Sequence, residues 1–274
     1  MTASSRGQLA GRAMLTLFMI LTLIPFVTLF STALQPAGSI PTGVSWPSDP
    51  QWGNFADAWR VANLTPLIGS SLLIVLGVVP ASLVLATLAG YGLATLRIPF
   101  ANAFFILFVL GLTIPFESLI TPLYYQMRDL GLLNSRWALI LPLIALFMPF
   151  GVFWMRAHFL TVPVELTEAA YIDGAGPWRA FRHIHLPLAM PALSSLAILL
   201  FLWTWNQFIL AFVMVDDPLK RTMAGALGAF QGRYGTDIVL LSAGALLIMA
   251  PTVLVFVLFQ RQFSKALLQG AVKG

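Results

Sequence analysis

The sequence contains no cysteine, and charged residues make up 9% of its 274 positions. The absence of thiols excludes disulfide bonds and thiolate metal sites. Soluble domains carry roughly 25% charged residues, so a soluble protein of this length would lack the charge needed to solvate its surface. Hydrophobic residues account for 59% of the chain instead, which indicates an integral membrane protein.

Long charge-free stretches recur along the chain, and each approaches the roughly 20 residues that a helix needs to cross the hydrocarbon core. They show no alternation with period two, and backbone groups in lipid must be hydrogen-bonded internally, so helices are favoured over barrel strands. We therefore predict an all-α integral membrane protein that forms a single domain over residues 1–274. Its six predicted transmembrane helices lie at about 13–34, 67–95, 101–122, 137–158, 189–212 and 238–261.

The distribution of basic residues predicts how the chain is oriented. Arg6 and Arg12 precede the first apolar run, but this run is too long for a typical signal peptide and no cleavage site clearly follows, so we expect a retained first helix. With the N-terminus inside, the inner side carries nine Lys and Arg against three acids, and the outer side six against seven. This bias follows the positive-inside rule and predicts cytoplasmic termini. The net charge of +5 reflects topology, and no nucleic-acid partner is expected.

The longest inner segment, 159–188, is predicted to fold as a helix–turn–helix. Pro163 suits the first turn of a helix, and Gly174 suits its end, because glycine readily adopts the left-handed backbone found there. A second short helix is expected over 178–185, ended by Pro187. The segment would present a polar surface at the inner face of the membrane.

A spaced pattern runs through this segment: Glu-Ala-Ala, three residues, Gly, nine residues, then Ile-x-Leu-Pro. Alanines keep a surface small enough for another protein to approach, and the glutamate offers that protein one charge. A Glu-Ala-Ala tripeptide alone would indicate an ordinary amphipathic loop, but the full spacing favours a docking surface. The nearby His183 and His185 have no third ligand, so no metal site is predicted.

The spacing resembles the EAA loop of ATP-driven import permeases. From about residue 65 to residue 274 the chain is similar to MalG-like permeases of carbohydrate ABC importers, with a weaker likeness in FSTALQP at 30–36. The phrases that carry the likeness include IPFESLITPLYY (114–125), LGLLNS (130–135), LILPL (139–143), IHLPLAMPAL (184–193), WNQFILA (205–211), FQRQF (259–263) and GAVKG (270–274).

This resemblance implies a non-catalytic transport subunit of a prokaryotic inner membrane. The ATPase-docking residues would be Glu168, Ala169, Ala170, Asp173, Gly174, Ile184, Leu186 and Pro187. The implied partners are a homologous second permease, two copies of an ATPase subunit or one ATPase dimer, an extracytoplasmic solute-binding protein, and a sugar. The sequence lacks a GxxxxGK[ST] phosphate loop, so ATP and Mg²⁺ would sit on the separate ATPase, and no cofactor is expected on this chain.

Polar residues inside the apolar stretches are candidates for the substrate path, because buried polar groups in membranes usually face a bundle interior or a wet cavity. Trp203, Asn206 and Gln207 offer the aromatic face and amides that sugars need, and Glu117 is a further candidate. Contacts between helices and an interfacial tryptophan belt would account for Trp203, Asn206 and Gln207 equally well. Glu117 would alternatively be a residue in the outer mouth that touches only water. Gln207 stands where the family usually has an acid, which leaves the identity of the sugar open.

Other functions compete with sugar import as explanations of the sequence. The same importer role for a glycerophosphodiester or another polar organic solute is the alternative substrate. An ion-coupled secondary transporter would need an acid at the midplane or paired broken helices, and no inverted repeat is apparent. An intramembrane enzyme would need a converged set of catalytic side chains inside the spans, and the sequence offers none.

Overall fold

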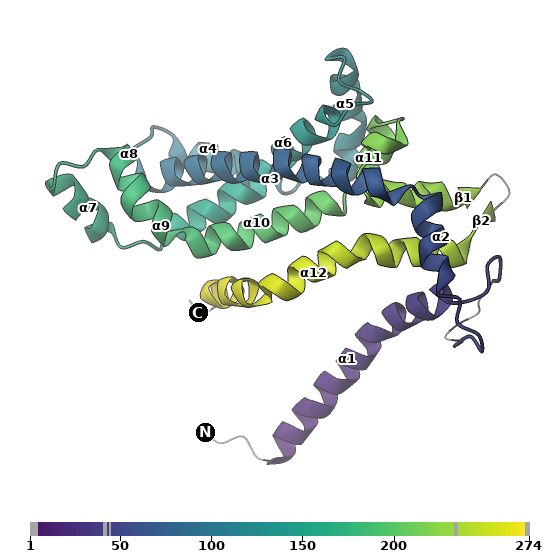
Figure 1. The fold of residues 1–274 in the computed structure, drawn as a ribbon. Helices are drawn as coiled ribbons and strands as arrows, with labels where there is room; N and C mark the ends of the chain where they lie inside the picture. Colours follow the sequence, from purple (N-terminus) through teal and green to yellow (C-terminus); the bar gives the residue numbers. More distant parts are fainter. Residues whose placement is uncertain (1–4, 41–42, 44, 233–234, 272–274) are drawn as a thin grey trace. The chain divides into compact units, whose positions relative to one another are not determined.

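A computed structural model describes residues 5–40, 43, 45–232 and 235–271. These residues are almost entirely helical, which confirms the predicted all-α class (Figure 1). The chain divides into two compact units, residues 1–65 with 226–250 and residues 66–225 with 251–274. The single domain expected from the sequence stays a prediction, and each unit is described by itself.

The first unit contains the N-terminal helix and the short segment that follows it. Phe30, near the end of the first helix, makes ring contacts with Trp46, Trp52 and Phe55. The side-chain amide of Asn54 donates to the carbonyl oxygens of Ala33 and Gln35 at 2.9 and 2.8 Å, which ties the segment to the helix end. The elements of this unit are α1 (Ser5–Ala33), α2 (Gly53–Val61), η3 (Ala224–Phe230), the two-residue antiparallel strands β1 (Gln231–Gly232) and β2 (Gly235–Thr236), and the first part of α12 (Ile238–Ala271).

The second unit is a helical bundle that carries the predicted inner segment at one end and an outer turn region at the other (Figure 1). Its elements are α3 (Leu64–Thr95, shared with the first unit at its start), α4 (Ala101–Gly111), α5 (Phe116–Asp129), α6 (Trp137–Phe159), α7 (Val164–Ile172), α8 (Pro177–Ala180), η1 (Phe181–His185), α9 (Leu186–Leu188), α10 (Met190–Trp205), α11 (Ile209–Met214), η2 (Pro218–Lys220) and the rest of α12.

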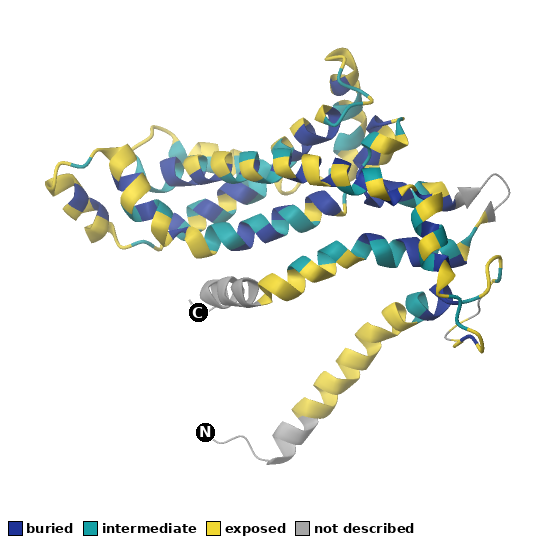
Figure 2. Ribbon diagram, in the orientation of Figure 1, coloured by how far each residue is buried: buried dark blue, intermediate teal, exposed yellow. Residues whose placement is uncertain are grey.

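Helix α6 contributes to both hydrophobic clusters of this bundle, and its buried positions run along much of its length (Figure 2). Close approach to α3 depends on residues with little or no side chain. A Cβ placed on Gly90 of α3 would lie 2.7 Å from the Cβ of Met155, and one on Gly151 of α6 would lie 2.8 Å from the Cβ of Ala86. Small residues let membrane helices pack at short range, where dispersion contacts and not the hydrophobic effect hold them together.

Four helices in the described part of the chain are long and apolar enough to cross a membrane, and the number rises to six if each of two bent helix pairs is one span. The continuous helix predicted over 101–122 is wrong. Helix α4 ends at Gly111 and α5 begins at Phe116, with a bend of 99° between them. Pro115 has no N–H to donate and disfavours a helical residue before it, so the helix breaks in front of α5.

The fifth predicted helix, 189–212, is also interrupted. Helix α10 ends at Trp205, and α11 begins at Ile209. The carbonyl oxygen of Gln207 accepts from the Thr222 hydroxyl, and the Gln207 side-chain oxygen accepts from Leu210 N at 3.4 Å. Side chains therefore satisfy backbone groups that a continuous helix would have paired internally.

The packing of α3 on α6 generates a prediction. Gly90→Ala should lower the thermal stability of the purified protein, because the added Cβ would meet the α6 backbone at Arg156 N, 2.8 Å away. Overpacking of this kind costs roughly 1–3 kcal/mol. Gly92→Ala is the matched control on the same helix, since its Cβ would meet a flexible Ile98 methyl at 3.4 Å. Equal melting temperatures for the two variants would contradict the close-packing argument.

Candidate coupling segment and substrate path

The first half of the inner segment folds as the sequence predicts. Helix α7 starts directly after Pro163 and carries Glu165 in its first turn. It ends at a left-handed glycine, because Gly174 has φ of +77°. Ala175 N donates to Ala170 O at 2.9 Å and Gly174 N to Tyr171 O at 3.1 Å, the two bonds of a Schellman cap.

The second half differs from the prediction, because Pro187 does not end the helix. The chain stays helical from Pro177 through Leu188, with a wider π-type turn over Phe181–His185. Leu186 N donates to Phe181 O across this turn. Pro187 has no N–H to donate to the preceding turn. The helix continues through it because the preceding turn widens to a π-type turn. Helix α10 then follows at a bend of 72°.

The structure does not gather all eight predicted docking residues on one surface. Glu168, Ala169, Asp173, Gly174 and Pro187 are exposed, whereas Ile184 and Leu186 are half-buried. Ala170 is buried against its own chain at 8% exposure. The exposed part of α7 therefore carries Glu168 and Ala169 on the surface, while Ala170 lets α7 lie close to its own bundle.

A buried hydrogen bond that the sequence did not reveal joins the two halves of the segment. The hydroxyl of Thr167 and Nε2 of His185 lie 3.0 Å apart, and their residues are 7% and 1% exposed. His185 Nδ1 is buried without a partner among the described residues, so Nε2 makes the hydrogen bond of this ring. Thr167 directly precedes Glu168, and His185 lies between Ile184 and Leu186. Their position beside residues of the EAA spacing is the sequence signal that could have pointed to this pair.

Aromatic contacts fasten the segment to the ends of α3 and α6. The ring centroid of Tyr91 in α3 lies 4.9 Å from that of Phe181 and 5.0 Å from that of His185. The Tyr91 hydroxyl also donates to Pro177 O at 2.9 Å. Phe159, the last residue of α6, makes edge contacts with Tyr91 and His185. The segment is thus packed onto two long helices, and we name residues 164–188 the coupling segment.

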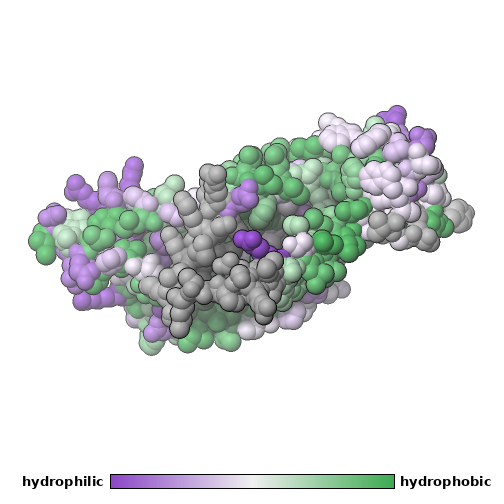
Figure 3. Space-filling view, turned by 90° about the horizontal axis from the view of Figure 1, so that it is seen from below, coloured by the Kyte–Doolittle hydropathy of each residue, from purple (hydrophilic) through white to green (hydrophobic). Residues whose placement is uncertain are grey.

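The surface around this segment differs from the rest of the bundle. Hydrophilic side chains gather at the end that carries α7 and α8, and hydrophobic side chains cover much of the neighbouring surface (Figure 3). Such a boundary is expected where a membrane helix leaves the hydrocarbon region.

The four candidates for the substrate path have separate surroundings. Trp203 is 40% exposed and makes ring contacts with Phe147 and Phe150 of α6. The Asn206 amide donates to Leu202 O at 2.8 Å and to the Thr252 hydroxyl at 3.3 Å. In the described part of the chain, no hydrogen bond or ring contact joins any two of the four candidates.

Trp203 and Asn206 are both exposed near the end of α10, whereas Gln207 is half-buried and turned towards Leu210. Glu117 is exposed in the first turn of α5. Trp203 with Asn206 is therefore the pair that could face a solute, and the Thr252 contact shows that Asn206 also links α10 to α12.

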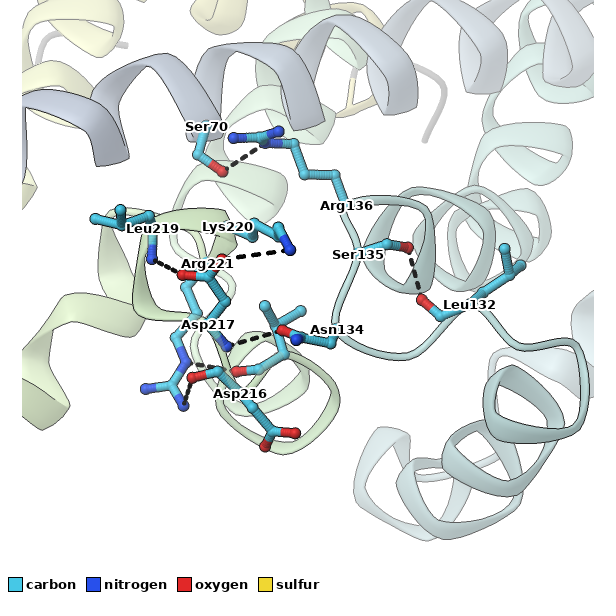
Figure 4. A network of polar contacts seen from close by, with 11 residues as sticks. Ser70, Leu132, Asn134, Ser135, Arg136, Asp216, Asp217, Leu219, Lys220 and Arg221 are labelled. Carbon is cyan, nitrogen blue, oxygen red and sulfur yellow. Dashed lines mark hydrogen bonds and ion pairs between the residues drawn. The ribbon is translucent and has the colours of Figure 1, made fainter.

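A polar network at the other end of the bundle was missed by the sequence reasoning (Figure 4). Asn134 has a left-handed backbone with φ of +58°, which asparagine tolerates better than most residues. Its backbone N–H donates to Met214 O at 2.9 Å, and its side-chain oxygen accepts from Asp217 N at 2.8 Å. Nε of Arg136 donates to the Ser70 hydroxyl at 2.9 Å. These bonds connect the segments after α5 and α11 with α3.

Asp217 holds the turn in this network. The N–H of Leu219 donates to its carboxylate at 3.0 Å, and Lys220 lies 3.3 Å away. The hydrogen bond from Leu219 first, and then Lys220, lower the pKa of Asp217 below its usual range. Because its pKa is lowered, ionised Asp217 stabilises the folded turn at pH values above the usual carboxyl pKa. This stabilisation is lost as the pH falls through the lowered pKa.

The residues that the structure describes contain no group of three or more His, Cys, Asp and Glu side chains that could hold a metal ion.

The buried hydrogen bond generates the second prediction. Thr167→Val keeps the side-chain shape but leaves His185 without its hydrogen-bond partner, at a cost of roughly 1–3 kcal/mol. Hydrogen–deuterium exchange of the purified protein should therefore speed up across 164–188. Thr161→Val is the control, because its hydroxyl bonds to His158 O on the exposed surface. Unchanged exchange in the first variant would show that the bond does not hold the segment.

Comparison with known proteins identifies the family. Residues 82–269 match the model of the binding-protein-dependent transport system inner membrane component. The chain is 32% identical to the diacetylchitobiose uptake system permease protein NgcG of Streptomyces coelicolor, over 99% of this chain and 91% of that protein. It is 36% identical to the arabinooligosaccharides transport system permease protein AraQ of Halalkalibacterium halodurans, over 91% of each.

Among solved structures, the fold is similar to a chain of a bacterial ABC transporter involved in the import of the acidic polysaccharide alginate. The TM-score is 0.77 at 20% identity, over 96% of this chain and 99% of that one. With most of its length matched by the family model and by these relatives, the chain belongs to the family of binding-protein-dependent transport system inner membrane components and is a multi-pass membrane protein.

Proposed function

We propose that this chain is the permease subunit of an ATP-driven, binding-protein-dependent sugar importer and forms half of its translocation pathway. The observation that carries the proposal is the coupling segment. It exposes Glu168 and Ala169 on one side and is packed on the other against Tyr91 and Phe159, at the ends of two long helices.

The coupling segment would transmit movement of the ATPase to the membrane helices. ATP and Mg²⁺ would bind to a separate ATPase, either two copies or one dimer, and this chain would hydrolyse nothing. Closure of the ATPase pair would move the segment, and the Thr167–His185 bond and the Tyr91 contacts would carry that movement to α3 and α6. Alternating exposure of a central site then requires only that helices rock as packed bodies.

The proposed assembly contains a homologous second permease and an extracytoplasmic solute-binding protein. Both termini would be cytoplasmic, in the inner membrane of a prokaryote. A cysteine introduced at Ala175 tests this orientation cleanly, because the native chain has none. An impermeant thiol reagent should not label it in intact cells.

The substrate is proposed to be a sugar on two grounds. The relatives NgcG and AraQ are named as permeases for diacetylchitobiose and arabinooligosaccharides. In this chain, Trp203 and Asn206 are exposed and could supply an aromatic face and an amide. Aromatic faces pack against the C–H surfaces of sugars, while amides bond their hydroxyls.

The docking role predicts that Glu168→Lys and Gly174→Asp uncouple transport from ATP hydrolysis. Charge reversal at exposed Glu168 would repel whichever cation or N–H group it meets on the ATPase. A side chain at Gly174 would strain the turn, because its φ of +77° suits glycine. Uptake of sugar by proteoliposomes should fall at least about tenfold, while the protein still inserts.

Asp129→Lys serves as the control, since it reverses an exposed acid on α5, far along the chain from the coupling segment. Uptake and ATPase activity that stay at the wild-type level in Glu168→Lys would refute the docking role of α7.

The path assignment predicts that Asn206→Ala lowers uptake by roughly one to two orders of magnitude, because a sugar hydroxyl would lose a partner worth roughly 1–3 kcal/mol. Trp203→Ala should act in the same direction. Thr252→Val is the decisive comparison, since it removes the Asn206 contact on α12 without touching the amide.

If Asn206 contacts sugar, Thr252→Val should leave uptake nearly unchanged and Asn206→Ala should not. If both variants reduce assembly with the second permease equally, Asn206 is a packing residue and the path assignment is wrong.

A further inference from the structure

An apolar groove opens on the side of the bundle next to the coupling segment. Its cavity volume is about 510 Å³, within the range of small-molecule sites. Its lining residues come from α3, from the start of α10 and from the short helical turns α8, η1 and α9. Leu83 and Leu88, Trp178 and Phe181, and Met190 and Leu193 line it. All of these residues belong to the second unit.

The lining suits an apolar occupant better than a sugar or another polar solute. Thr87 and Ser194 carry hydroxyls into the lining, but both hydroxyls already donate to carbonyl oxygens one turn earlier on their own helices, Leu83 O and Met190 O. A polar ligand would lose its water and find only the lone pairs of these two hydroxyls as partners. The chemistry of the groove is that of a hydrocarbon chain.

The position along α3 sets the depth of the groove. Leu83 lies 12 residues before Thr95, where α3 ends. At 1.5 Å per residue this is about 18 Å, close to half the roughly 30 Å hydrocarbon thickness. The α3 residues that line the groove, Leu83 to Leu88, therefore lie about 10 to 18 Å from the end of α3, deep in one leaflet. Trp178 also lines the groove and is 64% exposed, which suits the membrane interface where tryptophan is enriched.

Two arginines are neighbours in sequence of the aromatic residues that line the groove. Arg179 is adjacent to Trp178, and Arg182 is adjacent to Phe181. Both are exposed, and the ion pairs found in the described part of the chain lie elsewhere, at Arg60, Arg128 and Lys220. The stretch from Gly174 to Leu188 contains no acid.

We propose that this groove binds an anionic phospholipid, with one acyl chain between α3 and α10 and the phosphate at Arg179 and Arg182. Basic pockets between transmembrane helices on the cytoplasmic side recognise anionic headgroups, and arginine pairs with phosphate through two parallel N–H donors. The inference rests on the proposed function, because that function places the coupling segment at the cytoplasmic face. The lipid would bridge the bundle and the segment that moves with the ATPase.

The test uses the assembled transporter, purified in detergent with its partner subunits. Native mass spectrometry would compare retention of phosphatidylglycerol and phosphatidylcholine with identical acyl chains. Phosphatidylglycerol should be retained in preference, and Arg179→Gln and Arg182→Gln should each lower its retention about fivefold, since a cation near the headgroup contributes roughly 1 kcal/mol. Leu88→Trp, which fills the groove, should lower retention of both lipids.

Arg128→Gln is the matched control, an exposed arginine on α5 away from the groove. A second readout needs no groove-filling variant. Phosphatidylglycerol with brominated acyl chains should quench tryptophan fluorescence, and Trp178→Phe should remove part of that quenching. This reports occupancy even if Leu88→Trp fails to fold.

Three results would overturn the proposal. Equal retention of the two lipids would show that the headgroup makes no specific contact. Retention that does not change in Arg179→Gln, Arg182→Gln and Leu88→Trp would show that the lipid binds elsewhere. Lipid bound to the isolated chain but lost in the complex would show that the second permease covers the groove. Co-purification of the ATPase in the same preparation tests the proposed function separately. An assembled, active complex without bound lipid would contradict the lipid proposal and leave the proposed function intact.

Discussion

Hydrogen bonding of the backbone without water is the constraint on which this structure depends. In lipid each N–H and C=O must find a partner inside the protein, so long stretches of the chain become helices. The breaks are therefore informative, because each needs another way to satisfy its backbone. After α10, the Thr222 hydroxyl donates to Gln207 O, and the Gln207 side-chain oxygen accepts from Leu210 N. At Gly174, a Schellman cap bonds the last carbonyl groups of α7. These breaks coincide with the proposed substrate path and the proposed docking surface.

The sequence predicted the presence of the spans better than their continuity. A charge-free stretch reports a length that can cross a membrane, but Pro115 and Asn206 interrupt such stretches without adding charge. The EAA spacing predicted α7 and its glycine end correctly, because local backbone preferences decide both. It failed at Pro187, where a wider turn absorbs the missing N–H. Composition does not reveal such an adjustment.

The contacts that hold the candidate site together were beyond sequence reasoning for a different reason. Thr167 and His185 are 18 positions apart, and Tyr91 and Pro177 are 86 apart. Neither pair carries opposite charges or a spacing on one helix that would suggest contact. Asn134 and Asp217, 83 positions apart, are a further case at the other end of the bundle. Burial accounts for the Thr167–His185 pair, because a polar group taken out of water must find a partner wherever the fold offers one. The Asn134–Asp217 bond is exposed and follows from how the fold brings two turns together.

Helix α6 connects the proposed functional regions mainly through packing. At one end Phe159 contacts His185 of the coupling segment, and nearer its middle Phe147 and Phe150 contact Trp203. Between them, Gly151 and Met155 pack against α3 with no room for an added methyl group on Gly90 or Gly151. Close-packed interiors transmit displacement and do not absorb it. A shift of the coupling segment is thus expected to move α6 with it, and the wall around Trp203 changes position as a consequence of packing that already exists.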